Sequence, residues 1–145
     1  MEQRLSMITL GVADLTRAVA FYENVIGWTP APSLPNIVFF NLSGLLLALV
    51  PHVDLAKGMN AVAHESHDFA YKGFFLSHNV RSKKEVDTIF SRLKDSGATI
   101  INEPEEAVWG GYYFYFSDVD GHSWRVFYNP QWTVQEDGRV SMKKN

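Results

Sequence analysis

The sequence predicts an α+β fold built of two modules, each with the element order β-α-β-β-β. Two segments with the apolar spacing of an amphipathic helix begin at Asp14 and Ser82, 68 positions apart. Each of them follows a strand-like segment and precedes further segments with strand patterns. A repeat of this length is typical of an internal duplication whose halves bury apolar surface together. The sequence therefore predicts one domain and not two independent ones.

The repeat also sets the expected boundaries. The domain is expected to span residues 1–132, with modules at about residues 5–52 and 72–130 and a crossover at residues 53–71. Residues 133–145 are mostly polar, and we expect them to form a frayed C-terminal tail.

The first module opens with a predicted strand at residues 6–12. Asp14 suits the N-cap of the helix that follows, because its carboxylate can accept hydrogen bonds from the free N–H groups of the first turn. Gly27 is expected to end this helix. The next stretch holds three prolines and cannot be a regular helix. Two strands are predicted after it, at residues 37–42 and 45–50.

The crossover has no clean apolar period, and we expect a short helix at most. The second module begins with a predicted strand at residues 73–80. Ser82 and Glu85 form the pattern of a capping box, and Gly97 is expected to end the helix. Three further strands are predicted, at residues 98–104, 111–118 and 122–129.

Composition excludes several classes of function. Hydrophobic residues make up 46% of the chain and charged residues 20%, as in an ordinary globular protein. The formal net charge is −3 and no basic block is present, so nucleic acid is not an expected partner. The chain has no cysteine, which excludes disulfides, thiolate zinc sites and a cysteine nucleophile.

Membrane insertion is not expected either. The strongest apolar run, residues 45–50, is far shorter than the roughly 20 residues that span a bilayer. The first residues lack the basic and apolar regions of a signal peptide. We therefore expect a cytoplasmic protein.

Two segments carry a resemblance to a known family. The segments "ITLGVADLTRAVAFYENVIGW" and "DVDGHSWRVFYNP" resemble the vicinal oxygen chelate superfamily, which includes glyoxalases, extradiol dioxygenases, fosfomycin-resistance proteins and bleomycin-binding proteins. The resemblance covers about residues 8–130. It implies a curved mixed sheet that forms a glyoxalase/bleomycin-resistance-like cup, and it makes a homodimer the expected assembly.

The resemblance also implies four metal-ligand positions, which His or Glu occupies in the metal-dependent members. In this chain they fall on Met7, on or next to Ala48, near Phe75, and on Arg125. None of these is a normal ligand for a divalent metal, and an arginine would repel a cation. We therefore expect the metal site to be lost and predict no cofactor. A divalent metal would require different ligands from those that the resemblance assigns.

Arg125 is the main candidate for ligand binding. Strand alternation places it on the cup side with Ser123 and Phe127. The resemblance to fosfomycin-resistance proteins implies that Tyr115 faces a ligand, with Tyr113 on the same face. Such a surface suits a small aromatic or anionic molecule. The alternative is a structural role, in which Arg125 pairs with a carboxylate such as Glu103 or reaches solvent.

Other residues complete the prediction. The expected ligand-binding residues that face the cup are Arg125, Tyr115, Tyr113, Phe127, Phe75, Met7, Trp109 and His67. His64 and His67 lie in the crossover, where they are either solvated or placed to act as an acid or base. No catalytic residue is assigned.

The "DVDGH" segment has a structural interpretation. Asp118, Asp120 and Gly121 are expected to form a turn in which carboxylates bind backbone N–H groups, with His122 bonded inside it.

The sequence is therefore compatible with three functions. The first is a metal-free protein that binds a small aromatic or anionic molecule. The second is a metal-dependent lyase, isomerase or dioxygenase with non-standard ligands. The third is a structural or regulatory dimer. The sequence does not identify the ligand.

Overall fold

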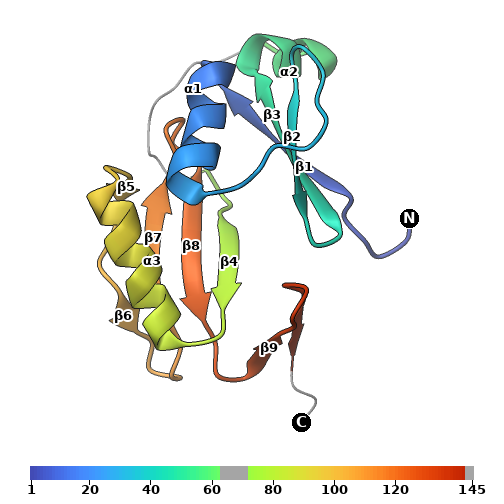
Figure 1. Cartoon of the computed structure of the whole chain (residues 1–145). Helices are drawn as coiled ribbons and strands as arrows, with labels where there is room; N and C mark the ends of the chain where they lie inside the picture. Colours follow the sequence, from blue (N-terminus) through green and yellow to red (C-terminus); the bar gives the residue numbers. More distant parts are fainter. Residues whose placement is uncertain (63–71, 143–145) are drawn as a thin grey trace. The chain divides into compact units, whose positions relative to one another are not determined.

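The structure is a computed structural model that describes residues 1–62 and 72–142. The chain divides into two compact units, Met1–Asp68 and Phe69–Asn145 (Figure 1). The division falls inside the predicted crossover. Each unit has its own mixed sheet, and the predicted α+β fold class is confirmed.

The first unit contains a three-stranded sheet in the order β1-β3-β2. Strand β1 runs parallel to β3, and β2 runs antiparallel to it. The elements are β1 (Met7–Val12), α1 (Leu15–Ala20), a π-helical segment η1 (Phe21–Ile26), β2 (Val38–Leu42), β3 (Leu45–Pro51) and α2 (His52–Gly58).

Local sequence signals account for the helix of this unit. The Asp14 side chain accepts a hydrogen bond from the backbone N–H of Arg17 at 2.9 Å, as expected of an N-cap. Gly27 adopts a left-handed conformation with φ of 88° and ends the helix. The Tyr22 ring packs 5.7 Å from the ring of Phe40, which lies on β2. This contact joins the helical segment to the sheet.

The described part of the first unit has one strand fewer than the β-α-β-β-β pattern. Between η1 and β2 only an isolated bridge forms, from Leu34 to Ile37. Proline has no backbone N–H to donate to a strand partner, and Pro30, Pro32 and Pro35 lie in this stretch. The prolines therefore explain why this stretch forms only an isolated bridge.

The second unit has a five-stranded sheet and a separate two-stranded hairpin. The sheet order is β4-β8-β7-β5, and β6 also pairs with β7. Its elements are β4 (Leu76–Val80), α3 (Lys83–Asp95), β5 (Thr99–Ile100), β6 (Glu105–Glu106), β7 (Tyr112–Ser117), β8 (Ser123–Tyr128), β9 (Trp132–Val134) and β10 (Val140–Met142).

Helix α3 lies across one face of the second unit's sheet (Figure 1). Ser82 accepts a hydrogen bond from the N–H of Glu85 at 3.2 Å, which is the first half of a capping box. The Glu85 carboxylate accepts from the N–H of Arg81, one residue before the expected position. Phe90 of the helix packs 5.3 Å from Phe114 of β7. The cap and the apolar stripe together place α3 on this face.

Two of the expected strands are shorter in the structure. The strand predicted at residues 98–104 is interrupted after Ile100 and resumes as β6 only beyond Pro104. At the break, the N–H groups of Ile101 and Asn102 both donate to the oxygen of Tyr115, at 2.9 and 3.4 Å, and this bulge interrupts the regular pairing. The strand predicted from residue 73 begins at Leu76, after Gly73 in a left-handed conformation.

The expectation of a frayed tail is wrong for residues 133–142. Val134 pairs with Val140 and Thr133 with Ser141, so this part of the chain forms the antiparallel hairpin β9–β10. Residues 133–142 are mostly polar, as expected, and largely exposed, although the strands include Val134, Val140 and Met142. The sequence pattern did not predict the hairpin, because the hairpin depends on a tight turn and on side-chain hydrogen bonds.

The "DVDGH" turn has the structure expected of it. Asp118 is 2% exposed, and its Oδ1 accepts hydrogen bonds from the backbone N–H groups of Asp120 and His122, each at 2.9 Å. Its Oδ2 lies 2.9 Å from Nδ1 of His122. Gly121 has φ of 80°, which a side chain would disfavour. The turn thus connects β7 and β8 at a fixed geometry.

Within residues 1–62 and 72–142, no helix combines the length and apolar character needed to cross a bilayer.

Candidate functional site

Four of the predicted ligand residues lie side by side on β7 and β8. Tyr115 stands opposite Arg125, and Tyr113 stands opposite Phe127. Residues paired in this way point to the same face of a sheet. The opposite face carries Phe114, which packs on α3. The four side chains therefore lie on the face that α3 does not cover.

We call this surface the arginine face. It consists of the four strand residues and two residues that contact them from outside the strands, namely Tyr113, Tyr115, Arg125, Phe127, Phe75 and Trp109. All six were predicted to bind ligand.

Arg125 is held between aromatic rings. Its Cζ lies over the ring of Phe127, 4.1 Å from the centroid, and over that of Phe75 at 4.8 Å. Phe75 in turn meets the ring of Tyr115 edge-on at 5.3 Å. A guanidinium is weakly hydrated and binds aromatic faces well, so these contacts favour its positive charge here. The rings contact the face of the guanidinium, and its N–H groups point outward in the plane of the guanidinium.

Arg125 has no carboxylate partner among the described residues. Its Nε is buried and forms no hydrogen bond there. Glu103, the partner that a structural role suggested, instead lies 3.7 Å from Nζ of Lys94. A buried N–H without a partner is costly, typically about 1–3 kcal/mol. Within residues 1–62 and 72–142, the guanidinium of Arg125 therefore has no anionic partner.

Tyr113 carries a second polar group on this face. Its hydroxyl donates a hydrogen bond to Glu105 Oε1 at 2.7 Å. This hydrogen bond raises the pKa of Tyr113 above its usual value, with smaller contributions from burial and from the charge of Glu105. The phenol therefore stays protonated at neutral pH and keeps its donor role.

Trp109 lies at one end of the arginine face. It sits in a turn closed by hydrogen bonds from the N–H of Gly110 to Ala107 and from that of Ala107 to Gly111, both at 2.8 Å. The indole is 48% exposed and meets the Phe127 ring edge-on at 5.7 Å. A Cβ on Gly111 would lie 2.0 Å from an indole carbon. Glycine at this position therefore allows Trp109 to reach Phe127.

Replacing Gly111 by Ala is expected to displace the Trp109 ring from Phe127. The near-ultraviolet circular dichroism and the tryptophan emission should both change, because the indole loses its fixed aromatic neighbour. Gly58→Ala is a matched control, since a Cβ there meets nothing within 4 Å. Identical spectra for Gly111→Ala and the unaltered protein would contradict this packing.

The structure does not test the other two predicted ligand residues. Met7 lies on β1 in the first unit and is half-exposed. His67 lies outside the described residues, as does His64.

The positions that the resemblance assigned to metal ligands do not fit a metal. Ala48 is fully buried on β3, Phe75 packs against Arg125, and Arg125 carries a positive charge. Met7 offers only a thioether, a weak ligand for hard divalent ions. In the described ranges, no three His, Cys, Asp or Glu side chains are grouped closely enough to hold a metal ion.

Two side chains on or beside the arginine face were not predicted. Asn79 of β4 stands opposite Phe127, and its buried Nδ2 has no hydrogen-bond partner among the described residues. The alternation along β4 could have identified it. Trp132 of β9 meets Phe127 edge-on at 5.9 Å. It was missed because the segment that follows it was expected to be irregular.

Comparison with known proteins places this arrangement in a family. The model of the Glyoxalase/Bleomycin resistance protein/Dioxygenase superfamily matches residues 4–126. The chain belongs to this superfamily. The expected resemblance to vicinal oxygen chelate proteins is thereby confirmed.

Two transferases are similar to this chain over most of its length. A metallothiol transferase FosB from Lysinibacillus sphaericus is 26% identical over 120 residues, which cover 83% of this chain and 78% of that protein. A glutathione transferase FosA from Serratia marcescens is 25% identical over 122 residues, covering 84% and 78%.

Solved structures of the superfamily share the fold. A glyoxalase-related enzyme from Fulvimarina pelagi is 30% identical with a TM-score of 0.86, and the match covers 98% of this chain and 99% of that one. The fosfomycin resistance protein FosX from Listeria monocytogenes is 26% identical with a TM-score of 0.69, covering 89% and 95%. The chain is thus similar to superfamily members over nearly its full length.

Proposed function

We propose that this protein binds a small planar anion on the arginine face without a metal ion. The observation that carries the proposal is the state of Arg125. Its Nε is buried without a hydrogen-bond partner among the described residues, and its Cζ lies over two phenyl rings. A carboxylate or a similar planar anion supplies a negative charge and oxygens that can accept hydrogen bonds from the guanidinium.

The surrounding side chains favour a flat, partly apolar ligand. The rings of Phe75 and Tyr115 meet edge-on beside the guanidinium, and Trp109 exposes part of its indole at the other end. Aromatic walls with few polar groups are typical of small-molecule sites. The hydroxyl of Tyr115 and the amide of Asn79 add polar groups next to the charge. The positive charge of Arg125 thus favours an anionic ligand, and the aromatic side chains around it favour a planar one.

The competing function is a metal-dependent enzyme, and the relatives' names favour it. They include a metallothiol transferase and a glutathione transferase. The sequence resemblance added lyases, isomerases and dioxygenases to this class. Against it stand the donors at the assigned positions, because Ala48, Phe75 and Arg125 offer no metal ligand. We therefore favour metal-free ligand binding over a metal-dependent enzyme.

The test compares two ligands that differ in charge and hardly in shape. Binding of 2-naphthoate and of 2-naphthamide should be followed by nuclear magnetic resonance titration of the unaltered protein. A charge-assisted hydrogen bond contributes about 1.5–3 kcal/mol, so the carboxylate should bind roughly 10-fold more tightly or better. Equal affinity for the two compounds would contradict the proposal.

The homodimer and the cytoplasmic location expected from the sequence stay predictions. Light scattering of the purified protein tests the first of them.

A further inference from the structure

Phe127 is the centre of an aromatic cluster that includes the C-terminal hairpin. Three rings meet it edge-on, Trp109 at 5.7 Å, Tyr113 at 6.4 Å and Trp132 at 5.9 Å. Phe127 itself is 3% exposed, whereas Trp132 is half-buried. The same Phe127 ring lies under the guanidinium of Arg125. The hairpin therefore reaches the arginine face through one indole.

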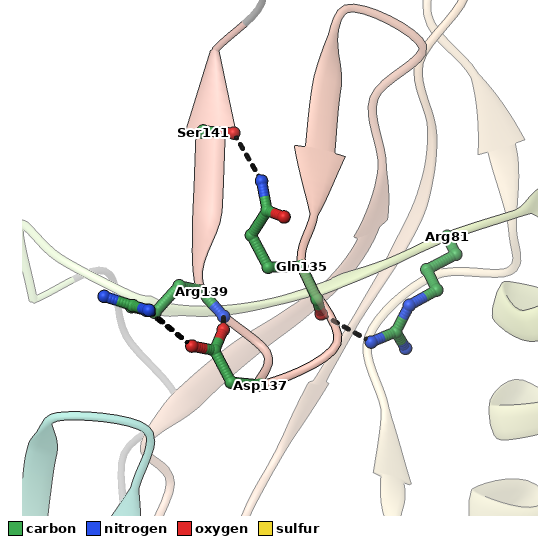
Figure 2. Close-up of polar contacts among 5 residues, drawn as sticks. All are labelled: Arg81, Gln135, Asp137, Arg139 and Ser141. Carbon is green, nitrogen blue, oxygen red and sulfur yellow. Dashed lines mark hydrogen bonds and ion pairs between the residues drawn. The ribbon is translucent and has the colours of Figure 1, made fainter.

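The hairpin is attached to the sheet by a second contact. Nη2 of Arg81, the residue after β4, donates a hydrogen bond to the backbone oxygen of Gln135 at 2.7 Å (Figure 2). A two-stranded hairpin alone is marginally stable in water. The Trp132 contact with β8 and the Arg81 contact at the end of β4 therefore hold the hairpin against the sheet.

The hairpin also has its own internal hydrogen bonds. Gln135 Nε2 donates to Ser141 Oγ at 3.1 Å across the two strands, and the Arg139 Nε donates to Asp137 Oδ2 at 2.7 Å in the turn (Figure 2). The N–H of Gln135 donates to the oxygen of Arg139 at 2.8 Å. These bonds add to the two contacts that attach the hairpin to the sheet.

The hairpin lies outside the part that the superfamily model describes. That model ends at residue 126, before Trp132. The match to the Fulvimarina pelagi structure, in contrast, covers 98% of this chain. The superfamily match therefore assigns no role to the hairpin.

We propose that the β9–β10 hairpin is a wall of the ligand site, with Trp132 as the residue that determines how large an aromatic ring system the site accepts. This inference rests on the proposed binding of an anion at Arg125. The guanidinium and the indole both contact Phe127, so one bicyclic ligand can reach both. The anion binds Arg125, and the second ring of the ligand stacks against Trp132.

The test uses two variants with a matched control. Trp132→Leu removes the ring, and Arg81→Met removes the bond to Gln135. Arg139→Met makes the same change of charge and size within the hairpin, where its partner is Asp137 in the turn. Benzoate and 2-naphthoate are the probes for ring size, and 2-naphthamide is the neutral reference. Affinities are measured by calorimetry.

The unaltered protein should bind 2-naphthoate more tightly than benzoate. Trp132→Leu should weaken the binding of 2-naphthoate roughly 2- to 10-fold, the range expected for loss of one aromatic contact, and leave the binding of benzoate unchanged. Arg81→Met should lose part of the preference for 2-naphthoate over benzoate. Arg139→Met should keep this preference. All three variants should still prefer the carboxylate to the amide.

Two outcomes would overturn the inference, and they are distinguishable. If Trp132→Leu and Arg81→Met keep the full preference for 2-naphthoate over benzoate, the hairpin is not a wall of the site, and binding at Arg125 stands. If the unaltered protein does not distinguish 2-naphthoate from 2-naphthamide, the proposed function itself fails, and the inference fails with it.

Discussion

Replacing Arg125 by Met is expected to weaken the binding of 2-naphthoate about 10- to 100-fold, because charge-assisted hydrogen bonds of about 1.5–3 kcal/mol are lost. The fold should survive the change. Met fills a similar volume on the apolar face between Phe75 and Phe127. It also removes a buried N–H that has no partner among the described residues, so the free energy of unfolding should stay within about 1 kcal/mol.

Arg125→Lys separates charge from geometry. A lysine keeps the positive charge but cannot form two parallel hydrogen bonds with a carboxylate. Its affinity for 2-naphthoate should lie between those of Arg125→Met and the unaltered protein, as measured by calorimetry. If Arg125→Met binds normally, or if it unfolds, Arg125 has a structural role and the proposed function is wrong.

Replacing Asp118 by Ala is expected to lower the free energy of unfolding by about 3–5 kcal/mol, because each buried donor left without a partner costs about 1–3 kcal/mol. Three donors depend on this carboxylate, namely the N–H groups of Asp120 and His122 and the ring of His122. Urea unfolding followed by circular dichroism measures the loss. Because this turn connects β7 and β8, the same substitution should also strongly disturb the side-chain arrangement of the arginine face.

Two controls accompany this prediction. Asp118→Asn keeps an oxygen that can accept from both N–H groups, and it should lose less stability than Asp118→Ala. Asp137→Ala removes a carboxylate from the exposed turn of the hairpin, where solvent screens its ion pair with Arg139, so it should change the stability little. If Asp118→Ala is no more destabilising than Asp137→Ala, the three hydrogen bonds do not hold the turn.

The fold was largely predictable because its signals are local. The caps at Asp14 and Ser82 and the left-handed glycines fix the helices, and alternation fixes which side of each strand is buried. The same alternation brought Arg125 to the face of Tyr113 and Tyr115. Residues on paired strands are predictable neighbours, because a strand has a period of two.

The missed features depend on contacts that no local pattern encodes. Trp132 reaches Phe127 only because the hairpin after it is ordered, and that order depends on the contact from Arg81 to Gln135. The absence of a strand before β2 depends on prolines, which the sequence did show. The roles predicted for Met7 and His67 stay untested, since one lies in the other unit and one outside the described residues.

Calorimetric titration of 2-naphthoate into protein freed of metal with EDTA tests the central claim most directly. Elemental analysis must first show that the protein sample is free of metal, and the titration is then repeated with Mn²⁺, Ni²⁺ or Zn²⁺ added. We expect one ligand per chain and the same Kd with and without each metal, with binding weakened in Arg125→Met. Binding that requires a metal, or a metal retained in stoichiometric amount through EDTA treatment, would contradict the account and favour the metal-dependent enzyme.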